Sequence, residues 1–207
     1  MNPTLKQHWE KVYHEKQPNE VSWWQEYPKT SLEFIHSLNI AKTAQIIDIG
    51  GGDSKFVDYL LDEGFEHITV LDISENAIER AKLRLGDKAK RVHWVVSDVK
   101  EFQPETAFDV WHDRATFHFL MSQPDIEQYI SVAQQSIQLG GHLILGTFSS
   151  TGPNKCSGLP VHQYDEASLL SELQTYFEKI ECIREDHITP FNTRQNFLFC
   201  SFRRKLS

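Results

Sequence analysis

The chain has 207 residues, of which 40% are hydrophobic and 24% are charged, proportions typical of a soluble globular domain. This length is enough for one domain with a substantial buried core. The formal net charge of −8 disfavours general binding to nucleic acid, because phosphate backbones attract basic surfaces.

Neither the ends nor the cysteines of the sequence point to export or to a membrane. No apolar stretch approaches the length of a transmembrane helix, and the first residues lack the apolar core of a secretory signal. The three cysteines, Cys156, Cys182 and Cys200, are widely spaced and form no CxxC pair. We therefore expect a cytoplasmic protein with reduced thiols, in which Cys182 and Cys200 pack inside apolar strands. The ten histidines form no HxH or HExxH pattern, so no metal site is predicted.

The N-terminal forty residues differ from the rest of the chain in their aromatic content. They include His8, Trp9, Tyr13, Trp23, Trp24 and Tyr27. Large aromatic side chains outside the core elements either pack at the edge of a domain or cover a ligand. We expect residues 1–40 to form a partly helical lid segment, with residues 20–25 over a ligand-binding cleft. Packing at the domain edge is the alternative for each tryptophan.

From residue 44 to residue 148, strand and helix patterns alternate with short loops. The apolar runs predict strands over residues 45–49, 67–72, 92–96, 108–112 and 142–148. Helices are predicted over residues 55–63, from Ser74 as N-cap to Gly86, and over residues 125–139 before Gly140 and Gly141. This alternation indicates parallel strands joined by right-handed crossovers.

The pattern changes after residue 148. A polar loop over residues 149–159 precedes a predicted helix at about residues 165–176. Two strand-like runs follow, residues 177–188 and 196–202, and a short turn that contains Pro190 separates them. Strands so close in sequence can pair as an antiparallel hairpin.

The most informative segment is the glycine-rich turn after the first predicted strand, in residues 46–54. Gly50 and Gly52 fit the first two glycines of a dinucleotide-binding turn, but Lys55 stands in place of the third. Glycine allows the backbone to approach a ligand closely. Asp72 closes the next apolar run, where a carboxylate can accept hydrogen bonds from both hydroxyls of a ribose.

With these motifs the chain resembles the class I S-adenosylmethionine-dependent methyltransferases from about residue 44 to residue 202. Their first motif, acidic-x-Gly-x-Gly-x-Gly, is matched by Asp48, Gly50, Gly52 and Ser54, with serine in place of the last glycine. The resemblance implies a doubly wound α/β fold with a seven-stranded, mostly parallel sheet and an antiparallel last strand. It also implies that residues 41–207 form the methyltransferase domain and that S-adenosyl-L-methionine is the cofactor.

The resemblance further implies which residues bind the cofactor. Gly50 and Gly52 should admit the methionine part, and Asp48 should orient backbone amides or meet the ammonium group through water. Asp72 should bind the ribose and Asp98 the adenine amino group; the alternatives are a helix N-cap for Asp72 and a solvated turn for Asp98. The complete predicted set is Trp23, Trp24, Asp48, Gly50, Gly51, Gly52, Asp72, Ile73, Ser97, Asp98, Val99 and Asp113.

Candidate catalytic residues lie at the end of the fourth predicted strand and just after it: His112, Asp113, Arg114 and His118. The Asp113–Arg114 step resembles the thiopurine methyltransferase branch, which implies a small, soft nucleophile as acceptor. A histidine could act as a base near neutral pH, although His118 could equally be a packed core residue. Arg114 could bind an anionic acceptor or pair with a carboxylate such as Asp113.

These observations predict an enzyme that methylates a small thiol or amine-like acceptor. A protein acceptor, at a lysine or a terminal amine, is an alternative, as are an NAD-dependent oxidoreductase and a non-catalytic cofactor-binding module. Lys55 argues against the oxidoreductase, because close packing of helix against strand normally uses glycine there. No nucleic-acid or membrane partner is expected.

Overall fold

The computed structural model describes residues 3–206 and contains a seven-stranded sheet in the order β3-β2-β1-β4-β5-β9-β8. Neighbouring strands are parallel from β3 to β5, and β9 runs antiparallel to both β5 and β8. The predicted doubly wound, mostly parallel α/β sheet with an antiparallel last strand is therefore confirmed. The strands are β1 (Gln45–Ile49), β2 (His67–Asp72), β3 (Val92–Val96), β4 (Phe108–Arg114), β5 (Ile137–Phe148), β8 (Phe177–Ile188) and β9 (Arg194–Arg204).

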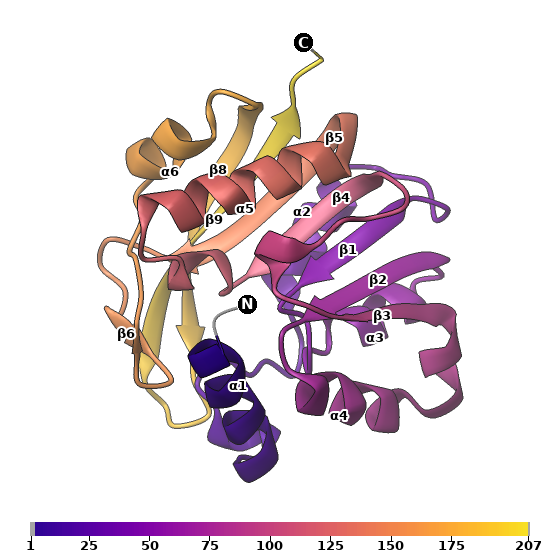
Figure 1. Cartoon of the computed structure of the whole chain (residues 1–207), viewed down its shortest axis with the longest axis vertical. Helices are drawn as coiled ribbons and strands as arrows, with labels where there is room; N and C mark the ends of the chain where they lie inside the picture. Colours follow the sequence, from indigo (N-terminus) through magenta and orange to yellow (C-terminus); the bar gives the residue numbers. More distant parts are fainter. Residues whose placement is uncertain (1–2, 207) are drawn as a thin grey trace.

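Helices cover both faces of the sheet, and successive strand residues such as Ile46 and Ile47 belong to separate core clusters on the two faces (Figure 1). Helices α5 and α6 pack into one cluster, and α2 and α3 pack into the other. The helices are α1 (Pro3–Glu15), α2 (Lys29–Ser37), α3 (Phe56–Asp62), α4 (Glu75–Leu85), α5 (Gln123–Ser136) and α6 (Glu166–Leu173).

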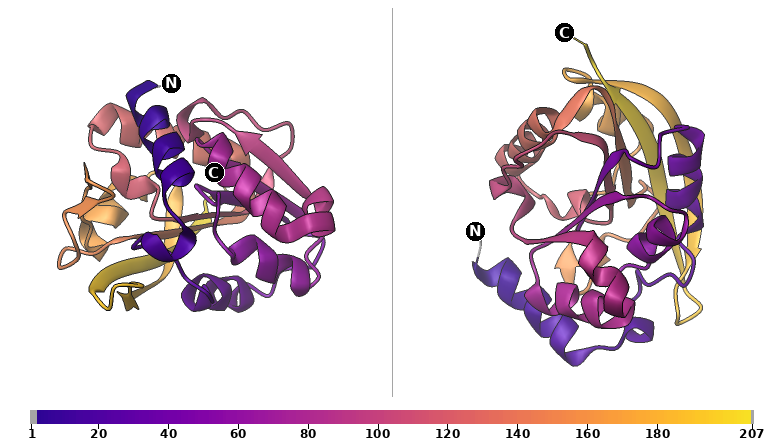
Figure 2. Two further views of the ribbon diagram at one scale, coloured as in Figure 1. Left: turned by 90° about the horizontal axis from the view of Figure 1, so that it is seen from below. Right: turned by 90° about the vertical axis from the view of Figure 1, so that its right-hand side faces the viewer.

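The centre of the sheet determines where a ligand can bind. From β1 the chain winds outward through β2 and β3, and it then returns to β4 on the other side of β1. In open α/β sheets such a reversal leaves a crevice beyond the carboxyl ends of the strands. Gly50, Asp72, Asp98 and Arg114 all lie at or just after these ends. Helix α1 lies beside α4 next to this crevice (Figure 2).

The boundary between α5 and β5 differs from the prediction. The helix ends at Ser136 and β5 begins at Ile137, five residues before the predicted start at His142. Gly140 and Gly141 lie inside the strand, where the pairing with β4 shifts register between Phe108 and Val110. The glycine pair therefore marks a bulge in a strand rather than the stop of a helix.

The hairpin of β8 and β9 contains a disulfide that the sequence analysis did not predict. Cys182 and Cys200 face each other across the ladder with a Cα–Cα distance of 4.1 Å and are bonded. The expectation of three reduced thiols is therefore wrong for this pair. Opposite residues on one face of an antiparallel ladder come close enough to bond. Cys156 is free and buried.

The N-terminal region contains two helices with different surroundings. The buried residues of α2, including Leu32, Phe34 and Ile35, belong to the main core. Helix α1 instead packs beside α4. No helix within residues 3–206 is long and apolar enough to cross a membrane.

Candidate functional site

The turn after β1 has a backbone that only glycine fits well. Gly50 has a φ of +64°, and a Cβ there would collide with the hydroxyl of Thr116. A Cβ on Gly51 would collide with Asp48, and one on Gly52 would press on Asp72 and Ala77. The Gly50 amide donates to the Leu71 carbonyl over 2.7 Å. The turn is thus fixed tightly against the ends of β1 and β2.

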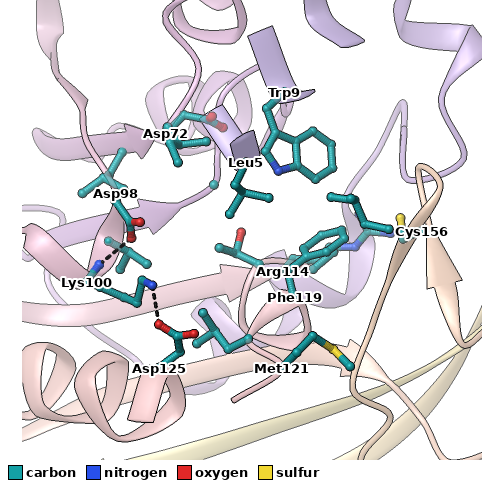
Figure 3. Close-up of a pocket in the computed structure, with 18 of the residues that line it drawn as sticks. Leu5, Trp9, Asp72, Asp98, Lys100, Arg114, Phe119, Met121, Asp125 and Cys156 are labelled. Carbon is teal, nitrogen blue, oxygen red and sulfur yellow. Dashed lines mark hydrogen bonds and ion pairs between the residues drawn. The ribbon is translucent and has the colours of Figure 1, made fainter. Parts of the chain in front are cut away.

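Two cavities adjoin this turn. The larger has a volume of about 340 Å³ and the smaller about 50 Å³, and both touch Tyr13, Trp23, Gly50 and Arg114. Figure 3 shows the larger one, with Asp98 and Lys100 toward one end and Arg114 and Cys156 toward the other. Its lining comprises Leu5, Trp9, Tyr13, Trp23, Gly50, Leu71, Asp72, Ile73, Ser97, Asp98, Val99, Lys100, Arg114, Ala115, Thr116, Phe119, Leu120, Met121, Asp125, Cys156, Leu159 and Pro160.

Asp72 is a buried carboxylate in the wall of the larger cavity. One of its oxygens accepts from the Ser74 amide over 2.8 Å, so the N-cap geometry considered as an alternative is present in part, although Ser74 itself caps α4. Burial first, and then the negative charges of Asp48 and Glu10, raise the pKa of Asp72 from 3.8 to about 7. A partner that donates hydrogen bonds to its ionised form would relieve this cost.

Asp98 lies at the other end of the same cavity. Its Oδ1 accepts from the Lys100 amide over 2.9 Å, while its Oδ2 is buried and has no partner within residues 3–206. A buried acceptor without a donor is costly, and such atoms often mark the position of a ligand. Ser97, Val99 and Ile73, also predicted to bind cofactor, line this cavity as well.

Asp48 and His112 form a buried pair behind the smaller cavity. His112 Nδ1 lies 2.7 Å from Asp48 Oδ1, and His112 Nε2 lies 2.9 Å from the Ser31 hydroxyl. Both ring nitrogens of His112 are therefore engaged by protein groups. The other oxygen of Asp48 is buried without a partner in the described chain. This pair holds Asp48 beside Gly51 of the glycine turn. Gly51 and Trp24 also line the smaller cavity.

Asp113 lines neither cavity and is fully buried. Its Oδ1 accepts from the amides of Thr116 and Phe117, and its Oδ2 accepts from the Tyr129 hydroxyl over 2.6 Å. Burial raises its pKa to about 6, against the lowering effect of these hydrogen bonds. This arrangement holds the turn after β4 and leaves no oxygen of Asp113 free for a ligand.

His118 also lies outside both cavities. Its ring packs on Phe148 with centroids 4.6 Å apart, and its Nδ1 accepts from the Phe148 amide. Burial and the charge of Arg114 lower its pKa to about 3, so the ring is neutral at physiological pH. Of the four predicted catalytic residues, the structure brings Arg114 to the larger cavity and His112 to the smaller one.

The roof of the larger cavity comes from one face of α1, which sequence reasoning did not resolve. Leu5, Trp9 and Tyr13 recur at every fourth residue, the spacing of a helical stripe, and all three line the cavity. Trp9 packs edge-to-face on Trp23 and on Phe119, with centroids 5.6 and 5.2 Å apart. We call Trp9, Tyr13, Trp23 and Phe119 the aromatic cluster.

The raised pKa of Asp72 predicts a pH dependence for ligand binding. Hydroxyl donors prefer the carboxylate form, which is only partly populated near pH 7. The Kd of S-adenosylhomocysteine should therefore rise by about five- to tenfold when the pH falls from 8 to 6, because one pH unit below the pKa changes the ionised fraction up to tenfold. Isothermal titration calorimetry across this range measures it. A flat profile in wild type, matching that of Asp72→Asn, would contradict the role of this carboxylate.

Comparison with known proteins finds a family that matches the part of the chain containing most of this site. Residues 46–141, which run from β1 into β5, match the methyltransferase domain family. This match agrees with the expected resemblance to the class I S-adenosylmethionine-dependent methyltransferases, whose cofactor is S-adenosyl-L-methionine.

Among curated proteins similar to this chain, the eEF1A lysine and N-terminal methyltransferase of Mus musculus is 23% identical over 144 residues, 66% of this chain and 20% of that protein. Nodulation protein S of Rhizobium tropici is 27% identical over 111 residues, 54% of this chain and 46% of that protein. The chain thus spans less than half the length of these curated relatives.

A solved structure shows the same fold over nearly the whole chain. The 1,6-didemethyltoxoflavin-N1-methyltransferase of Burkholderia thailandensis, with 1,6-didemethyltoxoflavin and S-adenosylhomocysteine bound, superposes with a TM-score of 0.76 at 18% identity, covering 97% of this chain and 87% of that one.

Proposed function

We propose that the protein transfers the methyl group of S-adenosylmethionine to a small-molecule acceptor with a thiol or amine-like nucleophile. The observation that carries this proposal is the pair of buried, unpartnered carboxylate oxygens, on Asp48 and Asp98, at the two cavities beside a glycine turn. Together with Asp72 they offer acceptors for the ammonium, ribose hydroxyls and adenine amino group of one elongated ligand.

The protein groups fit this cofactor in order along the crevice. Asp98, with Ser97 and Val99, would hold the adenine end, and Asp72 beside Ile73 would hold the ribose. Gly50 and Gly51 would admit the methionine part, with Asp48 beneath it and Trp23 and Trp24 beside it. Gly52 would act by allowing the turn to approach Asp72, since its own Cβ position is filled by that carboxylate.

The modest volume of the larger cavity supports a small acceptor. A volume of about 340 Å³ lies near the lower limit for ligand pockets, and an adenosyl group would occupy much of it. The aromatic cluster lines the remainder, and α1 contributes Leu5, Trp9 and Tyr13 to the wall. An enzyme with a protein acceptor would need an open groove at this point, and several relatives, such as the eEF1A methyltransferase, do act on proteins.

The chemistry needs little more than alignment and exclusion of water. Bound S-adenosylmethionine supplies a methyl group on a sulfonium that is already activated for displacement. The aromatic cluster would keep water from the acceptor, and the turn at Gly50 would fix the reacting geometry. No histidine within residues 3–206 lines the larger cavity, and of its carboxylates Asp72 and Asp98 would bind cofactor while Asp125 pairs with Lys100. The acceptor should therefore bind in a form that is already nucleophilic.

Titration of the purified protein with S-adenosylhomocysteine and with NADH tests the cofactor, and transfer of a radiolabelled methyl group tests the reaction. We expect S-adenosylhomocysteine alone to raise the melting temperature, and label to enter a small thiol or amine from a defined panel. Stabilisation by NADH alone would indicate an oxidoreductase. Label entering only the protein fraction of a cell extract would indicate a protein acceptor, and no transfer despite tight cofactor binding would indicate a binding module.

Residues 1–40 include the segment that we propose as the lid. Glu10 on α1 accepts from the amides of Glu75 and Asn76 over 2.8 and 3.1 Å, at the N-terminus of α4. Arg80 on α4 donates to the carbonyl groups of Tyr13 and Lys16 near the C-terminal end of α1. Each helix thus caps an end of the other, which complements both helix dipoles.

The Glu10→Ala change should loosen this attachment. We expect the dissociation rate of S-adenosylhomocysteine to rise several-fold, since the lost charge-assisted hydrogen bonds contribute about 1.5–3 kcal/mol to docking of α1. Stopped-flow displacement measures this rate. Glu15→Ala, on the exposed part of the same helix, is the matched control. An unchanged dissociation rate in Glu10→Ala would mean that α1 does not gate the cavity.

The cytoplasmic location expected from the sequence is also part of the proposal. The Cys182–Cys200 bond of the structure counts against this location, because a reducing compartment would keep both thiols reduced. Mass determination of the protein extracted under alkylating conditions shows which state is present, and an oxidised bridge would contradict this location.

A further inference from the structure

The guanidinium of Arg114 carries a charge that the described protein does not neutralise. Its Nη1 donates to the Trp23 carbonyl over 2.9 Å. Its Nε and Nη2 are buried and have no hydrogen-bond partner within residues 3–206. Burial lowers the pKa of Arg114 to about 10, so the group is still a cation at neutral pH. Leaving a buried cation unpaired is unfavourable unless a ligand completes it.

The other cations that line the two cavities are already paired. Lys55 pairs with Glu26, Arg80 pairs with Asp53, and Lys100 pairs with Asp125. Among the described residues no carboxylate lies within ion-pair distance of Arg114. Glu185 on β8 acts on its pKa only from further away. Arg114 is therefore the cation of these cavities that an incoming anion would meet without displacing a protein partner.

Arg114 lies where the acceptor would bind rather than where the adenine would. It ends β4, and in Figure 3 its guanidinium extends toward Cys156, away from Asp98. The nearby wall is apolar and includes Phe119, Met121 and Leu159. The Phe197 ring packs on the guanidinium, with its centroid 4.8 Å from the guanidinium carbon. The site thus combines one positive charge with apolar walls.

We propose that the methyl acceptor is an apolar carboxylic acid that also carries the thiol or amine-like nucleophile, and that its carboxylate is bound by Arg114. Nε and Nη2 form one edge of the planar guanidinium, and their two N–H groups match the two oxygens of a carboxylate. A single unpaired cation suits a carboxylate better than a phosphate, whose double charge needs more partners. Side chains commonly adjust their torsions on binding. Because Arg114 lines the cavity, its Nε and Nη2 edge can turn toward the ligand.

This inference rests on the proposed function and names its substrate class. The test uses protein saturated with S-adenosylhomocysteine, titrated by calorimetry with benzoate, phenylacetate and 2-naphthoate and with the uncharged carboxamide of each. We expect at least one acid to bind at least about tenfold more tightly than its amide. Arg114→Met should abolish this preference, and Arg184→Met, a matched change at an exposed position of β8, should leave it intact.

A second variant guards against misfolding of Arg114→Met. Glu185→Gln removes the negative charge that acts on Arg114, and we expect it to tighten binding of the acid by about threefold while leaving the amide unchanged. Unaltered binding of the acid in a folded Glu185→Gln protein would count against the inference.

Three outcomes would overturn the inference. The acids and amides could bind equally, or the preference could survive in Arg114→Met. Alternatively, Arg114→Met could weaken S-adenosylhomocysteine far more than 5′-methylthioadenosine, which lacks the amino-acid part. Arg114 would then hold the carboxylate of the cofactor instead. Failure of S-adenosylhomocysteine to bind wild type would contradict the proposed function itself, and this result is separate from the other three.

Discussion

Replacing Asp72 by alanine is expected to weaken binding of S-adenosylhomocysteine by about 1.5–3 kcal/mol, because hydrogen bonds to a charged acceptor contribute this much. The change corresponds to a Kd roughly ten- to a hundredfold higher. Asp72 is buried in the cavity wall and has few donors of its own, so the ligand is its main source of compensation. Calorimetry at pH 8 measures the effect. Asp87→Ala, at an exposed carboxylate, is the control and should bind normally.

The Asp72 carboxylate should strengthen ligand binding but lower the stability of the ligand-free protein. Burial raises the folded-state pKa of Asp72 to about 7, above its ordinary value of 3.8. The protonated form therefore favours the fold, and this contribution is complete below about pH 4 and lost as the pH rises through about 7. Asp72→Asn should stabilise the ligand-free protein at pH 8 by an amount on the order of 1 kcal/mol. Lower stability with unchanged ligand affinity would make Asp72 a structural residue only.

Replacing Asp113 by alanine is expected to lower the free energy of unfolding by about 2–4 kcal/mol, because buried donors lose their acceptor. The amides of Thr116 and Phe117 and the hydroxyl of Tyr129 would all be left unsatisfied. Urea denaturation measures the loss. The Kd of S-adenosylhomocysteine for the folded variant should change less than threefold, since Asp113 lines neither cavity.

Tyr129→Phe separates the parts of this network. It removes only the hydroxyl that joins Asp113 to the Trp111 indole and should cost about 1–2 kcal/mol. The Asp113→Ala/Tyr129→Phe double variant should be less destabilised than the sum of the two, because the residues share one hydrogen bond. Full stability of Asp113→Ala combined with lost methyl transfer would restore Asp113 as a catalytic residue.

Much of the cofactor crevice could be predicted because topology alone determines it. Parallel strands with a reversal at the centre bring their carboxyl ends to one edge, so Gly50, Asp72 and Asp98 had to come together. Their spacing in the sequence was sufficient evidence for this, and no side-chain detail was needed.

The roles of the residues at the end of β4 could not be predicted from the sequence, because the orientation of their side chains depends on strand alternation and packing. His112 and Asp113 point to opposite faces, where His112 meets Asp48 and Asp113 meets Tyr129. Both partners are remote in sequence. Arg114 reaches the cavity because Ala115, at a φ of +69°, turns the chain sharply after it.

The spacing of Cys182 and Cys200 in the hairpin contains a signal for the disulfide. In an antiparallel hairpin, paired residues have a constant sum of positions, and the pair Ile188 with Arg194 fixes the same sum as Cys182 with Cys200. A turn centred at Phe191 would have placed the two cysteines opposite each other. The predicted short turn, which contains Pro190, had no assigned centre and so left this register undetermined.

A crystal structure with S-adenosylhomocysteine tests the central claim most directly. The account predicts the adenine beside Asp98, both ribose hydroxyls within hydrogen-bond distance of the Asp72 carboxylate, and the amino-acid part over Gly50. A nucleoside bound elsewhere, or a crevice filled by the side chains of α1 with Asp72 facing protein donors only, would contradict it.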